Sequence, residues 1–272
     1  MWSYNPKRMN NFTVMSHKFR RSIITILALL LLFSLPLQAG QVSITAASDL
    51  QYAMKDIIGA YIRKNPDDKV SAVYGSSGKA FSQIENGAPY DMFFSADISY
   101  PQKLKTSGSA ISEPKPYAIG RMTVWVTKSS GLDARKGIRL LSDQKIRKIA
   151  MANPEHAPYG RIAKEVMEHY KVYDNVKSRI VLGENIQQTA QFVQTGAADV
   201  GMIAYSLALA PVLAKEGNYY LVPASAHKPI VQGYVLLKPA SGNRTASEFE
   251  RFIGSSEARM IFKRYGFTLP NE

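Results

Sequence analysis

The chain has 272 residues, of which 46% are hydrophobic and 20% charged, and it contains no cysteine. This composition indicates a globular protein with one large domain or two compact lobes, and it excludes disulfide bonds as a source of stability. The formal net charge is +13, and residues 1–39 hold five basic and no acidic residues. The rest has 29 basic and 21 acidic residues, or +8, without an obvious basic cluster. No nucleic-acid partner is therefore predicted, because a solvated basic surface explains this charge.

The first 39 residues have the pattern of a secretory signal peptide. Basic HKFRR precedes the apolar run IITILALLLLF, and SLPLQAG offers a small-residue cleavage site near Ala39. An uncleaved membrane anchor is the alternative, but about 20 apolar residues are needed to span a bilayer and Pro36 ends this run early. We therefore predict a cleaved signal peptide over residues 1–39 and a periplasmic mature protein.

Strand-like and helix-like segments alternate along the rest of the chain. The segment 48–64 is predicted as a helix because Leu50, Met54, Ile57 and Tyr61 share one helical face. Apolar or alternating runs predict strands, and polar segments with helical periodicity follow most of them. The predicted strands are 42–46, 69–75, 91–96, 121–128, 148–152, 178–183, 199–204 and 231–238, and the other predicted helices are 76–87, 161–170, 184–196 and two within 245–267.

This alternation predicts an α/β protein with largely parallel sheets. The segments PYAIGRMTVWVTK and KPIVQGYVLLK lie far apart in the chain, and both are predicted to cross between two lobes. The resulting division gives a first lobe of residues 40–118 and 233–272 and a second lobe of residues 119–232.

Four predicted junctions between a strand and a helix share a small, polar or glycine-bearing character: AASDL, YGSSGK, NPEHAPYG and GENIQQ. Ligands of open α/β sheets bind at such junctions, where helix N-termini present free N–H groups and partial positive charge. Ser48 and Ser77 add hydroxyl donors. The pattern predicts an anion site, although Ser48 with Gln51 also fits a capping box that needs no ligand.

A catalytic interpretation of the same junctions has less support. Glu155 and His156 resemble a base and its partner, which leaves a secreted hydrolase as an alternative. No histidine stands at metal-ligand spacing from another, and no G-x-S-x-G or H-E-x-x-H motif occurs. We predict neither an enzyme, nor a bound metal cation, nor a cofactor.

Taken together, these junctions resemble those of the periplasmic molybdate-binding proteins of ATP-binding-cassette transporters. The similarity extends from about Val42 to Pro270 and includes GSSGKAFSQIENGAPYDMFFSAD, YAIGR, GAADVGMIA and IFKRYGF in order. It implies a type II periplasmic-binding-protein fold, in which two lobes close over molybdate or tungstate in a cleft. It also implies delivery to a membrane permease.

The resemblance implies four ligand-binding residues. Ser48 and Ser77 are expected to donate through hydroxyl and backbone N–H groups, and Tyr159 and Ile186 through backbone N–H groups. Some members supply a tyrosine hydroxyl where this chain has Ala204, so we predict that Tyr159 replaces it and that Tyr205 is not a ligand. A carboxylate beside a dianion repels it, and we therefore expect the Asp49 side chain to turn outward.

The resulting functional prediction is a monomeric binding protein that captures molybdate, and also tungstate, for transport. Another tetrahedral oxyanion such as sulfate is the near alternative, because it has the same charge and shape. A sensory module that reports to a membrane receptor and the secreted hydrolase are the more distant alternatives.

Overall fold

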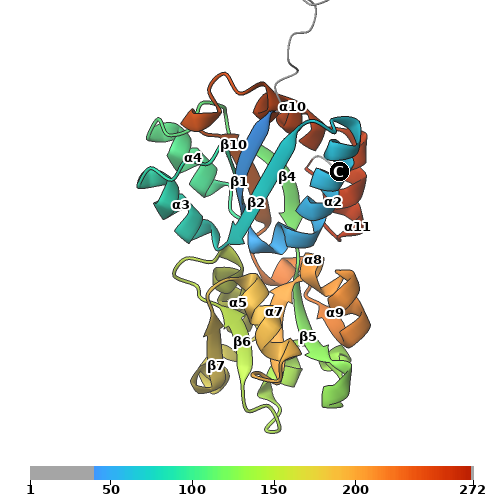
Figure 1. Ribbon diagram of the computed structural model, residues 1–272. Helices are drawn as coiled ribbons and strands as arrows, with labels where there is room; N and C mark the ends of the chain where they lie inside the picture. Colours follow the sequence, from blue (N-terminus) through green and yellow to red (C-terminus); the bar gives the residue numbers. More distant parts are fainter. Residues whose placement is uncertain (1–39, 271–272) are drawn as a thin grey trace, which may run out of the picture. The chain divides into compact units, whose positions relative to one another are not determined.

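The computed structural model describes residues 40–270, and the predicted signal peptide lies outside these residues. From Gly40 onward the chain forms one compact unit. It contains two five-stranded sheets with helices packed around each of them (Figure 1). Within the described part of the chain, no helix has the length and apolar character needed to cross a membrane.

The first sheet has the strand order β2-β1-β3-β10-β4. Strands β1, β2 and β3 are parallel, and β10 is antiparallel to both β3 and β4. The strands are β1 (Gln41–Ala47), β2 (Lys69–Gly75), β3 (Met92–Ser95), β4 (Lys115–Gly120) and β10 (Ile230–Leu236). The helices are α2 (Gln51–Lys64), α3 (Ser77–Glu85), α4 (Ser99–Thr106), α10 (Arg244–Ile253) and α11 (Ser256–Arg264).

The second sheet repeats this topology with the order β7-β6-β8-β5-β9. Strands β6, β7 and β8 are parallel, and β5 is antiparallel to β8 and β9. The strands are β5 (Met122–Thr127), β6 (Ile149–Ala152), β7 (Ile180–Gly183), β8 (Val200–Ala204) and β9 (Gly217–Leu221). The helices are α5 (Pro158–His169), α6 (Tyr173–Val176), α7 (Ile186–Gln194), α8 (Tyr205–Ala208) and α9 (Pro211–Glu216).

Hydrophobic periodicity explains most of these elements. Helix α2 buries Ala53, Met54, Ile57 and Tyr61, which recur at the spacing of one helical face. Strands β3 and β8 are buried along their whole length because helices or loops cover both faces, as expected for parallel strands inside a sheet. The predicted parallel arrangement therefore holds for four strands of each sheet, and one strand in each runs the opposite way.

The chain passes between the sheets twice. Strand β4 ends at Gly120 and β5 begins at Met122, so Arg121 alone makes the first connection. Residues 222–229 make the second connection, from β9 to β10. The first sheet therefore combines β10, from a late part of the sequence, with four strands from its early part. This arrangement brings the carboxyl ends of the parallel strands of both sheets to the segments that form the candidate site.

Candidate functional site

Ser48 follows the end of β1 and begins the short 3-10 helix η2 (Ser48–Leu50). Its side chain is 2% exposed, and its hydroxyl donates a hydrogen bond to Asn185 Oδ1 at 3.2 Å. The capping-box alternative is wrong, because neither η2 nor α2 has a side-chain cap. Ser48 instead contacts a residue 137 positions away, at the start of α7.

Ser77 is the first residue of α3 and is also buried. Its Oγ accepts a hydrogen bond from the backbone N–H of Ala96 at 3.0 Å. This bond occupies an oxygen lone pair and leaves the hydroxyl proton available for another acceptor.

Tyr159 lies in the first turn of α5, directly after Pro158 at the first helical position. The preceding loop is held by two bonds, from the N–H of Asn153 to the carbonyl of Gly183 and from the N–H of Ala157 to the carbonyl of Asn153. Gly160 packs so closely on the backbone of Ala152 that a Cβ atom there would collide with it. The glycine therefore allows α5 to pack on the end of β6, rather than opening space for a ligand.

Ile186 is the first residue of α7, and Asn185 is its N-cap. The Asn185 Oδ1 atom accepts hydrogen bonds from the N–H groups of Gln187 and Gln188, both at 3.0 Å, in addition to the Ser48 hydroxyl. The N–H of Ile186 itself is not used by this cap. Asn185 thus fixes the helix start and contacts the first sheet's segment as well.

Backbone and side-chain bonds bring these junctions together. The N–H of Gly78, at the start of α3, donates to the carbonyl of His156 in the loop before α5 at 2.9 Å. Ser206 of α8 donates through Oγ to the carbonyl of Asp49 at 2.8 Å. With the Ser48 to Asn185 bond, these contacts join the carboxyl ends of the two sheets. All four predicted residues therefore belong to one junction, although no hydrogen bond links their side chains to one another within residues 40–270.

The junction offers backbone hydrogen-bond donors at the starts of three helices. Within residues 40–270, the N–H groups of Ser77, Tyr159 and Ile186 donate to no protein acceptor, as expected for the first turn of a helix. Helices α3, α5 and α7 have nine, 12 and nine residues, so each carries a dipole whose positive end is at this junction.

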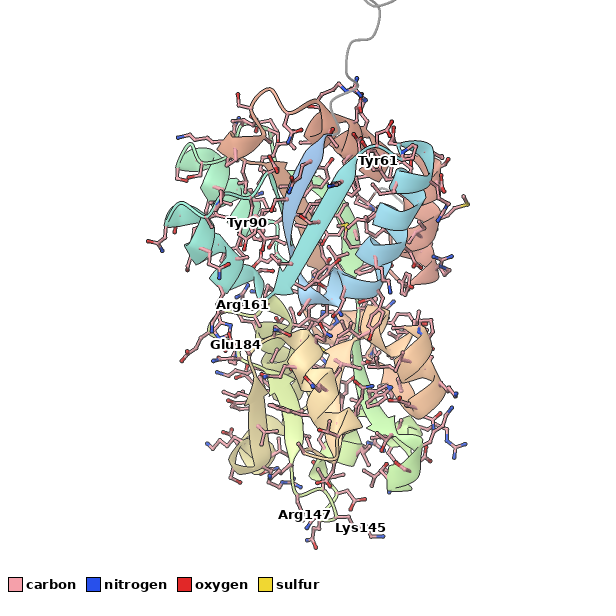
Figure 2. The ribbon with its side chains drawn as sticks, viewed as in Figure 1. Tyr61, Tyr90, Lys145, Arg147, Arg161 and Glu184 are labelled. Carbon is pink, nitrogen blue, oxygen red and sulfur yellow. The ribbon has the colours of Figure 1, made fainter. Side chains whose placement is uncertain are left out.

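The nearest cations are paired with acids across the two sheets. Arg161 Nη2 lies 2.5 Å from Asp97 Oδ2, and Lys79 forms an ion pair with Glu184. Arg161 and Glu184 are labelled in Figure 2. Each pair joins a helix of one sheet to a loop of the other, so these two cations are engaged with carboxylates.

The proposed catalytic pair of Glu155 and His156 is not formed. Glu155 is exposed and its backbone N–H contacts Asn153, whereas His156 Nδ1 lies 3.0 Å from Ser76 Oγ. The other ring nitrogen of His156 lies 3.5 Å from Glu184 Oε1. Glu184 is already paired with Lys79, so the three side chains join the sheets rather than activate a nucleophile. Among the described residues, no group of three or more His, Cys, Asp or Glu side chains is placed to hold a metal ion.

Asp49 does not turn outward as expected. Its side chain is 1% exposed, and Oδ2 accepts a hydrogen bond from Gln232 Nε2 at 2.6 Å. Burial raises the pKa of this carboxyl to about 6, against the opposing effect of the hydrogen bonds from Gln232 and Tyr159. The prediction failed because the partner of Asp49 lies 183 residues away in the sequence.

The hydroxyl of Tyr159 belongs to the same buried cluster. It accepts a hydrogen bond from Gln232 Nε2 at 3.1 Å, and burial followed by the nearby Asp49 carboxyl raises its pKa well above the usual value. Tyr205 begins α8, and its hydroxyl lies 3.3 Å from that of Tyr219.

Sequence reasoning missed two residues that organise the junction, Asn185 and Gln232. Asn185 had a local signal, since Asn directly before a predicted helix is a preferred N-cap. Gln232 had no such signal, because an isolated glutamine inside a predicted strand does not reveal that its side chain is fully buried.

The chain is similar to known solute-binding proteins over most of its length. The family model described as bacterial extracellular solute-binding protein matches residues 42–268. The molybdate-binding protein of Rhodobacter capsulatus is 36% identical over 249 residues, which are 91% of this chain and 96% of that protein. A Bacillus subtilis protein named as a candidate substrate-binding lipoprotein of an ABC transporter is 31% identical, over 83% of this chain and 85% of its own.

Among solved structures, the periplasmic molybdate-binding protein of Azotobacter vinelandii superposes with a TM-score of 0.79 at 31% identity. The match covers 85% of this chain and 100% of that one. It confirms the predicted α/β periplasmic-binding-protein fold. These relatives are binding proteins and not enzymes, which confirms that prediction too.

Proposed function

We propose that this chain, which belongs to the family of bacterial extracellular solute-binding proteins, captures molybdate outside the cytoplasm and delivers it to an ABC permease. The observation that carries the proposal is the convergence of three helix N-termini with free N–H groups and two buried serines at one junction. A fully ionised tetrahedral oxyanion has only acceptor atoms, and a site of neutral N–H and O–H donors complements it.

The proposed ligand-binding residues are Ser48, Ser77, Tyr159 and Ile186. Ser77 supports this assignment because its oxygen accepts the Ala96 N–H while its proton stays available. Ser48 donates to Asn185 Oδ1, an oxygen that already accepts two other N–H groups, and a charged acceptor forms a stronger bond. Tyr159 contributes through its backbone N–H, since its hydroxyl is engaged with Gln232.

The wider organisation follows the same proposal. Residues 1–39 are removed as a signal peptide, residues 40–118 and 233–272 form one lobe, and residues 119–232 form the other. The mature protein is a periplasmic monomer whose loaded form docks on the permease. The strand composition of the two sheets supports this division, because every strand of the second sheet lies between residues 122 and 221.

Isothermal titration calorimetry with molybdate, tungstate and sulfate tests the ligand. We expect tight one-to-one binding of molybdate and tungstate and much weaker binding of sulfate, because sulfate is the smaller anion and donors spaced for the larger ones approach it less closely. Tight binding of sulfate without a response to molybdate would contradict the proposal and favour a sulfate-binding protein.

The serines provide a test of the site. Ser48→Ala and Ser77→Ala each remove one hydrogen bond to a charged ligand, which is worth about 1.5–3 kcal/mol, or roughly a tenfold to hundredfold loss of molybdate affinity. Ser112→Ala is the matched control, because Ser112 Oγ also accepts a backbone N–H, that of Leu236, at the far end of β10. Unchanged molybdate affinity in both site variants would show that the anion binds elsewhere.

A further inference from the structure

A buried cluster of four polar side chains lies where the two sheets meet: Asp49, Tyr117, Tyr159 and Gln232. Gln232, on β10, is completely buried and lies at its centre. Its amide nitrogen donates to Asp49 Oδ2 at 2.6 Å and to the Tyr159 hydroxyl at 3.1 Å, and its amide oxygen accepts from the Tyr117 hydroxyl at 2.6 Å. Both amide protons are therefore used, and one side chain connects η2 of the first sheet to α5 of the second.

The backbone is shaped around this side chain. The register between β10 and β4 shifts between Gln232 and Gly233, and such bulges redirect a strand's side chains. Gly120, the last residue of β4, has no side chain at the place where the Tyr159 hydroxyl and the Gln232 amide meet, and a Cβ atom there would collide with both. The register shift at Gln232 and the glycine at position 120 thus both accommodate the hydrogen bond between Gln232 and Tyr159.

The cluster is connected to the proposed donors on both sides. Asp49 is the neighbour of Ser48 in the three-residue helix η2, and Tyr159 carries one of the free N–H groups itself. A change in the distance between Asp49 and the Tyr159 hydroxyl therefore moves donors from different sheets relative to one another. Neither Gln232 nor Asp49 needs to contact the anion for this effect.

We propose that Gln232 is a positioning residue of the oxyanion site, which holds Asp49 and Tyr159 together and thereby keeps the donors of the two sheets directed at one anion. The inference rests on the proposed function. It identifies a determinant of how long the anion stays bound, separate from the groups that bind it. Because Gln232 bonds the Tyr159 hydroxyl and not the donating N–H groups, its loss acts on dissociation rather than association.

Stopped-flow kinetics of molybdate binding tests the inference on the mature protein, with fluorescence of Trp125, the only tryptophan after residue 39. Gln232→Leu removes the link entirely. Tyr159→Phe removes only the hydroxyl, retains the backbone N–H, and is the milder change if the first variant does not fold. We expect each to raise the dissociation rate constant about tenfold or more, with the association rate constant within about twofold of wild type.

The double variant separates positioning from general destabilisation. Since both substitutions break one link, Gln232→Leu combined with Tyr159→Phe is expected to dissociate molybdate no faster than the faster single variant. Tyr61→Phe is the matched control: the Tyr61 hydroxyl donates to Asp68 Oδ2 at 2.6 Å in another buried pair, which lies within the first sheet's elements. It is expected to lower the melting temperature and leave both rate constants unchanged.

Dissociation at the wild-type rate in Tyr159→Phe would overturn the inference and leave the proposed function intact. Equal acceleration by Tyr61→Phe would also overturn it, because lost stability alone would then explain the effect. If the wild-type protein bound no oxyanion at all, the proposed function would fail, and this inference with it.

Discussion

At the scale of single residues, Asp49 makes the stability of the ligand-free protein depend on pH. Its pKa is about 6 in the folded protein, against 3.8 as the ordinary value, so the folded state binds more protons than the unfolded state between these pH values. The free energy of unfolding therefore falls as the pH rises through this window, by up to about 3 kcal/mol. Asp49→Asn keeps the side-chain volume and removes the titration. Urea unfolding at pH 4.5 and 7.5 is expected to show a smaller loss of stability in the variant, and equal losses would contradict the burial of an ionisable Asp49.

At the scale of elements, α5 and α3 each form an ion pair with a loop of the other sheet, Arg161 with Asp97 and Lys79 with Glu184. The four side chains are between 29% and 54% exposed, so each pair is worth up to about 1 kcal/mol and weakens with salt. Arg161→Met is expected to speed molybdate dissociation up to about fivefold in low salt, with less effect in 0.5 M NaCl. Lys64→Met is the control, since the Lys64 to Glu257 pair joins α2 to α11 within the first sheet's helices. A salt-independent effect, or an equal effect of the control, would exclude this role.

At the scale of the whole molecule, the proposed site takes donors from both sheets, so a bound anion is expected to stabilise the folded chain by mass action. At a free molybdate concentration 100 times Kd the gain is about 2.7 kcal/mol, which raises the melting temperature by roughly 5–10 °C for a chain of this size. A thermal-shift series with molybdate, tungstate, sulfate and chloride at equal ionic strength is expected to show this rise for the first two only. A rise common to all four anions would indicate a general salt effect instead of a binding site.

The sequence alone predicts some of these features better than others. Local signals at strand-to-helix junctions singled out Ser77, whereas Ile186 was named from the family resemblance, and helices α3 and α7 do begin at these two residues. The alternation of elements likewise predicted the α/β class. Strand β9 and the division of PYAIGRMTVWVTK into β4 and β5 were missed, because a one-residue connection at Arg121 leaves no turn signal.

The buried contact between Gln232 and Asp49 could not be predicted from the sequence, for a different reason. Gln232 and Asp49 are brought together by the passage of the chain out of the first sheet and back, and they lie 183 residues apart. Asp49 was expected to turn outward because a carboxylate repels a dianion, and the sequence gives no sign of the buried partner that holds it inside. A pairwise contact of this separation depends on the whole topology and not on local propensity.

The way the second sheet is formed has a consequence for how the protein acquires its structure. Residues 122–221 supply all five of its strands, and the ends of this segment lie together, since Thr123 pairs with Leu221 and the N–H of Val222 donates to the carbonyl of Met122 at 2.9 Å. The first sheet, in contrast, is complete only when β10 has been added between β3 and β4. Because the chain is synthesised from its N-terminus, the second sheet can therefore be completed before the first sheet, although the first sheet begins earlier in the sequence.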